Sequence, residues 1–257
     1  MIKKDGVYVV MGLLDPDSIA FAVGQDITRL GGKVIYTAQN ERMKGIFFDR
    51  SKKLGAEDKA GLHFEYCDVT IEEQVKALFE KIGPIDGVVH SIGYANPKTA
   101  LGQEFHTDAI DDLKLAFHIS CVSLATVTRH AYKQMKAGGS VVTLTFESQK
   151  AFAYYNWMGV NKAALEALVR ALARRHGATM LRGAEVQAIS RDGDTWRVET
   201  SKGPITARRI LNCAGAWALD VARRFGDDAP LDRIHRELKA AFDPDRVFNR
   251  GRLYPEL

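Results

Sequence analysis

The sequence predicts an α/β fold in which a doubly wound parallel sheet precedes an antiparallel β-meander and a short helical tail. Through the first two-thirds of the 257 residues, short apolar runs rich in β-branched residues alternate with amphipathic helical stretches. Repeated strand-helix units with buried strands are typical of parallel sheets that have helices on both faces. Beyond about residue 175, tight Asp-Gly and Lys-Gly turns separate short strands, which indicates an antiparallel meander.

The expected elements follow one another in a regular order. The first strand, 7–11, leads to a helix that begins after Ser18, a good N-cap residue, and ends on two glycines. Further strands are expected at 33–37, 63–67, 87–91 and 140–145, with helices at 41–54, 71–81 and 108–136 between them.

A last long helix follows the fifth strand and carries a clear apolar stripe. Its Leu165, Leu168, Val169 and Leu172 repeat at the spacing of one helix face. We expect this face to pack against the sheet.

The composition changes near residue 172, where the basic residues switch from mostly lysine to mostly arginine. Folding does not require such a switch, because the two side chains have similar helix propensities and similar exposure. We therefore expect a Rossmann-like dinucleotide-binding domain at 1–175. An atypical extension at 176–257 would follow and could complete the same sheet.

Charge and cysteine content exclude several classes of function. The net charge of +4 comes without a long basic run, which argues against nucleic-acid and membrane partners. Cys67, Cys121 and Cys213 are scattered and form no CxxC pair, so neither a metal site nor a disulfide framework is expected. A reducing cytoplasm suits this cysteine usage. No apolar stretch is long enough to span a bilayer.

Candidate ligand-binding residues follow the strands, because parallel sheets bind ligands at the carboxyl ends of their strands. After the first strand, Gly12 allows a tight turn, and the helix N-terminus at Ser18 and Ile19 offers free N–H groups to a pyrophosphate. An ordinary loop with a serine cap is the alternative. After the second strand stands Gln39, where many dinucleotide folds place an acidic residue for the ribose.

The third and fourth strand ends add further candidates. Asp68 could accept a hydrogen bond from an adenine amino group or, alternatively, cap the next helix. Gly93 would let a cofactor approach the backbone closely. His90 ends the fourth strand, and burial there favours a neutral structural histidine over a general base.

Tyr155 and Lys162 stand seven positions apart, so on a helix they would share one face, about 10 Å apart along the axis. Taken alone, they could be a half-buried aromatic residue and a solvated lysine. The Tyr-x3-Lys spacing of most short-chain dehydrogenases fails, because position 158 is Met. Instead, Tyr-x6-Lys together with "GLLDPDSIA", "QNERMKG", "CDVT", "HSIGYA" and "YNWMGVNKAALEA" resembles the bacterial enoyl-acyl-carrier-protein reductases over about residues 5–172.

This resemblance implies NADH-dependent reduction of a trans-2-enoyl thioester of acyl-carrier-protein or CoA, a step of fatty acid synthesis. Tyr155 and Lys162 would be the catalytic residues: Tyr155 would stabilise the enolate oxygen, and Lys162 would hold the nicotinamide ribose. The cofactor-binding residues that it implies are Gly12, Ser18, Ile19, Gln39, Asp68, Val69, Ser91, Ile92, Gly93 and Lys162. The substrate contacts that it implies are Tyr94, Ala95, Phe146 and Met158.

Some further expectations come from the same resemblance. Phe146, nine residues before Tyr155, matches the phenylalanine of the mycobacterial type. A homo-oligomer, commonly a tetramer, and a cytoplasmic location are also implied. The chain shows neither a ribose-binding carboxylate nor an arginine pair that would decide between NADH and NADPH.

The resemblance stops after residue 172, where the helical substrate lid of the reductases is not recognisable. Residues 173–222 resemble flavin-dependent amino-acid oxidases, and 230–257 resemble the C-terminus of flavin-linked glycolate oxidase subunits, as in a mosaic chain. The absence of a GxGxxG loop argues against FAD. Two alternatives to a reductase stay open: a flavin-dependent oxidase of small acids, and a non-catalytic nucleotide-binding module.

Overall fold

The computed structural model describes residues 2–52, 54–102, 109–146, 151–152, 154–181 and 183–210. The chain divides into two compact units, 1–178 and 179–257. The expected helical tail, residues 211–222 of the first flavin-oxidase-like segment and all of the second, 230–257, lie outside the described residues.

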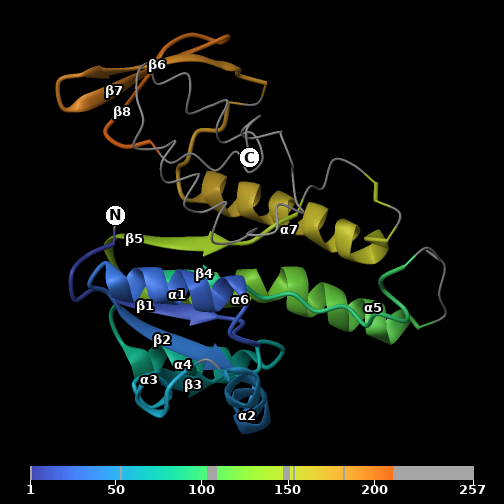
Figure 1. Cartoon of the computed structure of the whole chain (residues 1–257). Helices are drawn as coiled ribbons and strands as arrows, with labels where there is room; N and C mark the ends of the chain where they lie inside the picture. The colour runs from blue at the N-terminus through green and yellow to red at the C-terminus, as the bar shows by residue number, and fades with distance from the viewer. Residues whose placement is uncertain are drawn as a thin grey trace, which may run out of the picture. The chain divides into compact units, whose positions relative to one another are not determined.

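The first unit contains a sheet of five parallel strands in the order β3-β2-β1-β4-β5 (Figure 1). The strands are β1 Val7–Met11, β2 Lys33–Ala38, β3 His63–Tyr66, β4 Ile85–His90 and β5 Met135–Thr143. The strand order reverses between β1 and β4, which is the position where open α/β sheets bind ligands. The predicted doubly wound parallel sheet is confirmed.

Helices cover both faces of this sheet. α1 and α2 pack on one face, and α4 and α6 on the other. The described helices of the first unit are α1 Ile19–Arg29, α2 Glu41–Arg50, α3 Ala56–Ala60, α4 Glu72–Ile82, α5 Ile110–Phe117, the π-helical turn η1 His118–Val122, α6 Ser123–Gln134 and α7 Asn156–Arg175.

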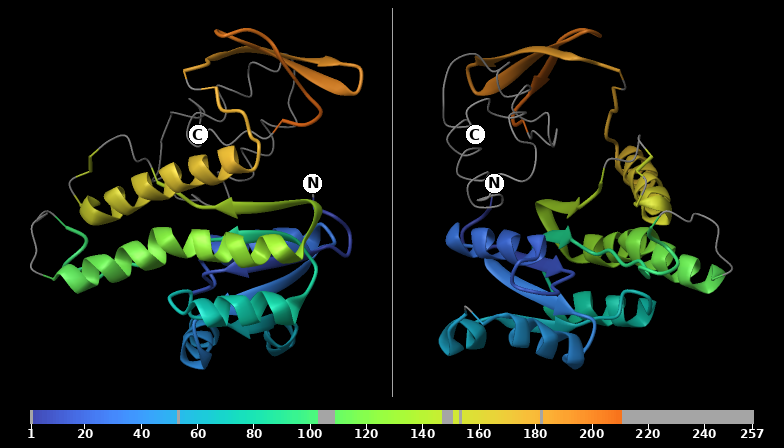
Figure 2. Two further views of the ribbon diagram at one scale, coloured as in Figure 1. Left: turned by 180° about the vertical axis from the view of Figure 1, so that it is seen from behind. Right: turned by 45° about the vertical axis from the view of Figure 1, so that its right-hand side comes forward.

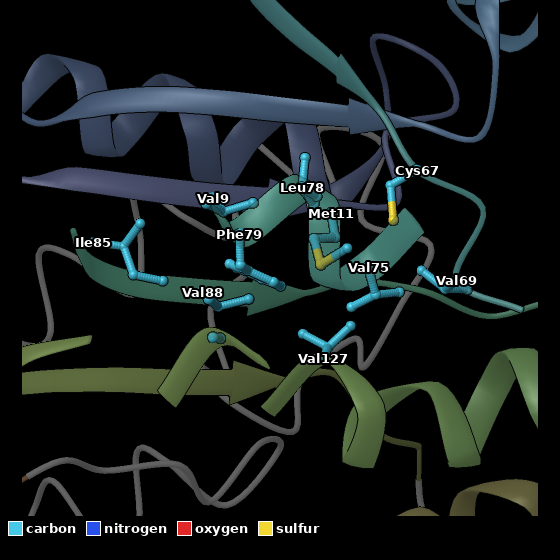
Figure 3. Close-up of a cluster of buried hydrophobic side chains, with 11 residues drawn as sticks. Val9, Met11, Cys67, Val69, Val75, Leu78, Phe79, Ile85, Val88 and Val127 are labelled. Atoms are coloured by element: carbon cyan, nitrogen blue, oxygen red, sulfur yellow. The ribbon is translucent and has the colours of Figure 1, made fainter. Parts of the chain in front are cut away.

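Successive side chains of β1 point to opposite faces of the sheet, so this strand contributes to the hydrophobic clusters on both faces. Val9 and Met11 pack with side chains of α4 and α6 (Figure 3). Tyr8 and Val10 pack on the other face with Phe21 of α1 and with α2. These two clusters fix the ends of the strands, and with them the loops that carry the candidate site.

The long helix expected at 108–136 is divided and shorter. The η1 turn separates α5 from α6, and Figure 2 shows the three as one continuous helical stretch. α6 ends at Gln134, and β5 takes up the following residues, which include the poor helix formers Gly138 and Gly139. The helix expected at 41–54 ends at Arg50, where the Ser51 hydroxyl donates to the Phe47 carbonyl at 2.6 Å.

The apolar stripe of α7 is buried only in part. Leu165 packs with Cys121 and Leu124, which belong to η1 and α6, and Leu168 lies against the same cluster. Val169 is 39% exposed. The stripe therefore packs mainly on the helical layer rather than on the sheet.

In the second unit, β6 Val186–Asp192, β7 Thr195–Thr200 and β8 Ile205–Ala207 form an antiparallel sheet of their own. Gly193 and Gly203 adopt positive φ angles of 58° and 106° in the turns, a conformation that glycine accommodates without strain. The predicted antiparallel meander is confirmed, and the boundary at residue 175 stays a prediction.

We expect Asp86→Asn to destabilise the first unit by about 1–3 kcal/mol at pH 7, because the buried carboxylate loses charge-assisted hydrogen bonds. Asp86 accepts from Lys3 at 2.8 Å, from Lys136 at 2.9 Å and from the Val7 N–H at 3.1 Å. The lysine hydrogen bonds hold the pKa of Asp86 well below its usual range.

Since the folded-state pKa is lowered, the stabilisation is complete above about pH 5 and declines as the pH falls below about 4. Urea unfolding of wild type and Asp86→Asn between pH 7 and pH 3 should show that the difference in their free energies of unfolding becomes smaller as the pH falls. A constant difference over that range would contradict this assignment.

Candidate active site

A cleft with a cavity volume of about 400 Å³ opens at the carboxyl ends of β1 to β4. Of the ten predicted cofactor-binding residues, all but Lys162 line it: Gly12, Ser18, Ile19, Gln39, Asp68, Val69, Ser91, Ile92 and Gly93. Tyr94, a predicted substrate contact, lines it as well. The four strand ends that were predicted to carry ligand contacts are therefore brought together in one cleft.

Several lining residues were not anticipated. They are Leu13, Leu14, Thr37, Ala38, Met43, Cys67 and Ile119. Five of them lie within two positions of a predicted residue, so widening each strand end by two positions would have found them, whereas Met43 lies in α2 and would have been missed. Ile119 comes from η1, which no sequence pattern indicated.

The turn after β1 brings the backbone close to the cleft. Gly12 has a φ of 90°, and a methyl group built on it would overlap the carbonyl oxygen of Ser91. Ser18 caps α1, its hydroxyl accepting from the Phe21 N–H at 3.3 Å, as predicted. The N–H of Ile19, at the first helical position, has no acceptor within the helix and lies at the cleft.

We expect Gly12→Ala to lower the free energy of unfolding by about 2 kcal/mol, because it adds both backbone strain and overlap with Ser91. It should also abolish stabilisation by NADH. Gly45→Ala is the matched control, since Gly45 lies in α2 with no atom within 4 Å of an added methyl group. Thermal unfolding should show the control unchanged or slightly stabilised. An equally stable Gly12→Ala protein would show that the turn is not constrained.

Asp68 and Gln39 are joined across the ends of β3 and β2. The Gln39 amide donates to Asp68 at 2.7 Å, and the N–H and hydroxyl of Thr70 donate to the same carboxylate at 2.9 and 2.6 Å. Burial raises the pKa of Asp68, but these hydrogen bonds outweigh it and lower the pKa overall. The alternative of a helix cap is wrong, because the N-cap of α4 is Ile71.

Lys162 is buried on α7, with 8% of its surface exposed. Its ammonium donates to the carbonyl of Leu144 at 2.9 Å, and a methyl group built on Gly93 would lie 3.9 Å from it. Burial lowers the pKa of Lys162. The solvated-lysine alternative is therefore wrong, and the amine stands next to a glycine that lines the cleft.

Tyr155 occupies the N-cap of α7 rather than a position inside the helix, and it does not belong to the cleft lining. Its ring packs on Phe146, with centroids 4.2 Å apart, and Phe146 also contacts Phe152 at 5.0 Å. Burial raises the pKa of the Tyr155 hydroxyl further above neutral pH, so the hydroxyl can act as a hydrogen-bond donor. Met158 is buried one turn before Lys162.

The η1 turn forms part of the wall of the cleft and holds a neighbouring loop in place. The Ser120 hydroxyl accepts from the Tyr94 N–H at 2.9 Å and donates to the Tyr94 carbonyl at 3.0 Å. The loop with Tyr94 and the partly buried Ala95 is thereby fixed next to Ile119. Single π-helical turns of this kind are frequent at functional sites.

His90 is fully buried and hydrogen-bonded, as predicted. Its ring nitrogens lie 3.0 Å from the Thr143 hydroxyl and 2.8 Å from the Ser123 hydroxyl. Burial lowers the pKa of His90 to about 4, so the ring is neutral at physiological pH.

The cysteines of the described part are buried and free. Burial raises the pKa of the Cys67 thiol, at the edge of the cleft, to about 12. Within the described ranges, no cluster of three or more His, Cys, Asp or Glu side chains is placed to hold a metal ion. None of the described helices is long and apolar enough to cross a membrane.

Comparisons with known proteins identify the family of the chain. A family model described as enoyl-(acyl carrier protein) reductase matches residues 12–193. The chain belongs to the enoyl-acyl-carrier-protein reductase family. The NADH-dependent family member FabI of Bacillus cereus is 35% identical over 232 residues, which cover 88% of this chain and 82% of that protein. The NADPH-dependent FabI of Staphylococcus aureus MRSA252 is also 35% identical, over 90% of this chain and 84% of that protein.

Solved structures of the reductase family resemble the fold. The Bacillus cereus reductase with NADP+ and an indole naphthyridinone has a TM-score of 0.60 at 35% identity, covering 68% of this chain and 69% of that one. The Anaplasma phagocytophilum enzyme in complex with NAD also has a TM-score of 0.60, at 30% identity, covering 69% of this chain and 68% of that one. The family resemblance inferred from the ordered motifs is confirmed.

Proposed function

We propose that this protein is an enoyl-acyl-carrier-protein reductase that uses a nicotinamide cofactor to reduce trans-2-enoyl thioesters in fatty acid synthesis. The observation that carries the proposal is a buried lysine ammonium next to Gly93, at the edge of a cleft that lies where the strand order of the sheet reverses. Relatives named as NADH-dependent and as NADPH-dependent support either cofactor. No described residue favours a flavin-dependent alternative.

The residues of the cleft fit a dinucleotide. At Gly12, only a residue without a side chain leaves room for a close backbone approach. The N-terminus of α1 at Ser18 and Ile19 suits a pyrophosphate, because free N–H groups and the helix dipole both favour an anion. Asp68 and Gln39 would hold the adenosine end. When bound, NADH or NADPH supplies the hydride for the β-carbon of the thioester.

Lys162 would orient the nicotinamide ribose. An ammonium has three donors, and the carbonyl of Leu144 takes one of them, which leaves two for ribose hydroxyls. Its positive charge would also stabilise negative charge that develops nearby, and this effect is strong because the group is largely removed from water.

Tyr155 would donate a hydrogen bond to the thioester oxygen as negative charge develops there. Its phenol is protonated at neutral pH, because the ordinary pKa of tyrosine lies near 10 and burial raises it further. Phe146, together with Met158 and the loop at Tyr94 and Ala95, would contact the acyl chain. Tyr155 stands at the N-cap of α7 and outside the cleft lining, so the thioester would have to extend beyond the cofactor cleft to meet its hydroxyl.

The substrate would be a thioester of acyl-carrier-protein or CoA, and the chain would act as a cytoplasmic homo-oligomer. Large apolar side chains stay exposed along the helical layer at Ile110, Leu115, Val122, Val160 and Val169. Exposed apolar surface of this kind is typical of subunit interfaces. Light scattering coupled to size exclusion would test the assembly, and a monomer at micromolar concentration would contradict it.

The function is tested by thermal-shift titration with NADH, NADPH and FAD in parallel, followed by cofactor consumption with trans-2-octenoyl thioester. We expect NADH or NADPH to stabilise the fold, since a ligand specific for the folded state must do so. We also expect the thioester to be reduced. Stabilisation by FAD alone would favour an oxidase, and binding of NADH without turnover would favour a non-catalytic module.

A further inference from the structure

His90 stands at the centre of a hydrogen-bond network that the proposed mechanism does not use. Its Nδ1 lies 3.0 Å from the hydroxyl of Thr143, at the end of β5. Its Nε2 lies 2.8 Å from the hydroxyl of Ser123, the first residue of α6. Because a fully buried imidazole must have both nitrogens satisfied, the ring fixes the separation of the two elements.

On one side, the network reaches the cleft. The Ser123 hydroxyl donates to the carbonyl of Ile119 at 2.7 Å, and Ile119 lines the cleft from the η1 turn. The ring of His90 is thus tied through one hydroxyl to the wall on which a cofactor would rest.

On the other side, the network reaches the lysine. The N–H of Leu144 donates to the carbonyl of His90 at 3.3 Å, and the Thr143 hydroxyl lies 3.2 Å from the same carbonyl. The carbonyl of Leu144 then accepts from Lys162 at 2.9 Å. The oxygen that holds the ammonium therefore belongs to the residue directly after the strand end that His90 secures.

We propose that His90 is a positioning residue for Lys162. Through Thr143 and Ser123 it holds the end of β5 against the start of α6, which is bonded to η1, so that the Leu144 carbonyl keeps the ammonium beside Gly93. The effect of this arrangement on turnover rests on the proposed reductase function. The position of the ammonium in the free protein does not depend on that function.

The neutrality of the ring agrees with this role. The positive charge of Lys162 adds to burial in lowering the pKa of His90. The thiol of Cys121, in η1, is the other titratable group that interacts with the ammonium. A neutral imidazole can serve one hydroxyl as donor and the other as acceptor without repelling the lysine.

The test compares His90→Gln with His130→Gln, since His130 is a second buried histidine, on α6, whose ring nitrogen lies 3.1 Å from Glu72. The pKa of Lys162 is measured in the free protein by NMR of ¹⁵N-lysine-labelled samples, with Lys162→Met used to assign the signal. In His90→Gln we expect the lowered pKa of Lys162 to rise toward the ordinary value of about 10.4, because the amine gains water. His130→Gln should leave it unchanged.

In the same samples, we expect His90→Gln to weaken NADH binding and kcat/KM by about tenfold, an effect comparable to the loss of one strong hydrogen bond. Thr143→Val removes one hydroxyl at nearly constant shape. It should also raise the pKa of Lys162 and weaken NADH binding, and it tests the proposal if His90→Gln does not fold. An unchanged Lys162 pKa and unchanged NADH affinity in these variants would overturn the proposal. A wild-type protein that fails to reduce enoyl thioesters would contradict the reductase function instead, and the pKa comparison would still stand.

Discussion

Replacing Lys162 with methionine is expected to lower kcat/KM for the enoyl thioester by about 100- to 1000-fold, which is typical when one preorganised electrostatic group is removed from a site. Methionine keeps most of the apolar stem and removes the ammonium. Both the hydrogen bonds to the ribose and the positive charge near the reacting atoms would be lost. The dissociation constant for NADH should rise as well.

The same substitution should leave the fold as stable as wild type, or more stable. Burial lowers the pKa of Lys162, which means that keeping this lysine charged in the folded protein reduces the free energy of unfolding. Thermal unfolding and steady-state kinetics on one preparation separate the two effects. Lys114→Met is the control, because Lys114 is exposed on α5 and its ammonium pairs with the exposed Asp111. Full activity of Lys162→Met would remove the lysine from the mechanism.

Replacing Tyr155 with phenylalanine should lower kcat by about 100-fold while the affinity for NADH stays within a factor of two or so. Only a hydroxyl is removed, and the ring can keep its contact with Phe146. The lost hydrogen bond is one that strengthens as negative charge develops on the thioester oxygen. Its removal therefore affects the transition state more than cofactor binding.

Tyr154→Phe is the matched control, because Tyr154 is the preceding residue and is 67% exposed. Pre-steady-state measurement of cofactor oxidation would separate the chemical step from product release. If Tyr154→Phe caused the larger loss, the two tyrosines would exchange roles. If neither variant lost activity, the proposed stabilisation of the enolate would be wrong.

The parallel sheet could be predicted because its central strands are short, apolar and rich in β-branched residues, which leaves few other structures for them. Val7–Met11 and Ile85–His90 are buried along almost their whole length, and such runs suit only the interior of a covered sheet. The cleft followed from the same pattern, since parallel strands bring their carboxyl ends to one edge. Gly12 and Ser18 added local signals for a tight turn and a helix start.

Other features depend on tertiary structure and have no signal in the sequence. The η1 turn is held by the contact of Ser120 with the Tyr94 loop, and the start of α6 by the contact of Ser123 with His90 at the end of β4. A helical pattern does not reveal these contacts. Lys162 is held by a backbone carbonyl, which any residue at position 144 would supply. Asp68 was a reasonable helix cap from its position, but Thr70 and Gln39 satisfy its carboxylate instead.

The central claim is that this cleft brings a nicotinamide cofactor and an enoyl thioester together for hydride transfer. The most direct test incubates the full chain with trans-2-octenoyl thioester and NADH carrying deuterium at the transferred position, followed by mass spectrometry of the product. We predict a saturated thioester with a single deuterium on the β-carbon, formed in step with NADH consumption and lost in Lys162→Met. A thioester that stays unsaturated while NADH binds saturably, or a saturated product without deuterium, would contradict the account.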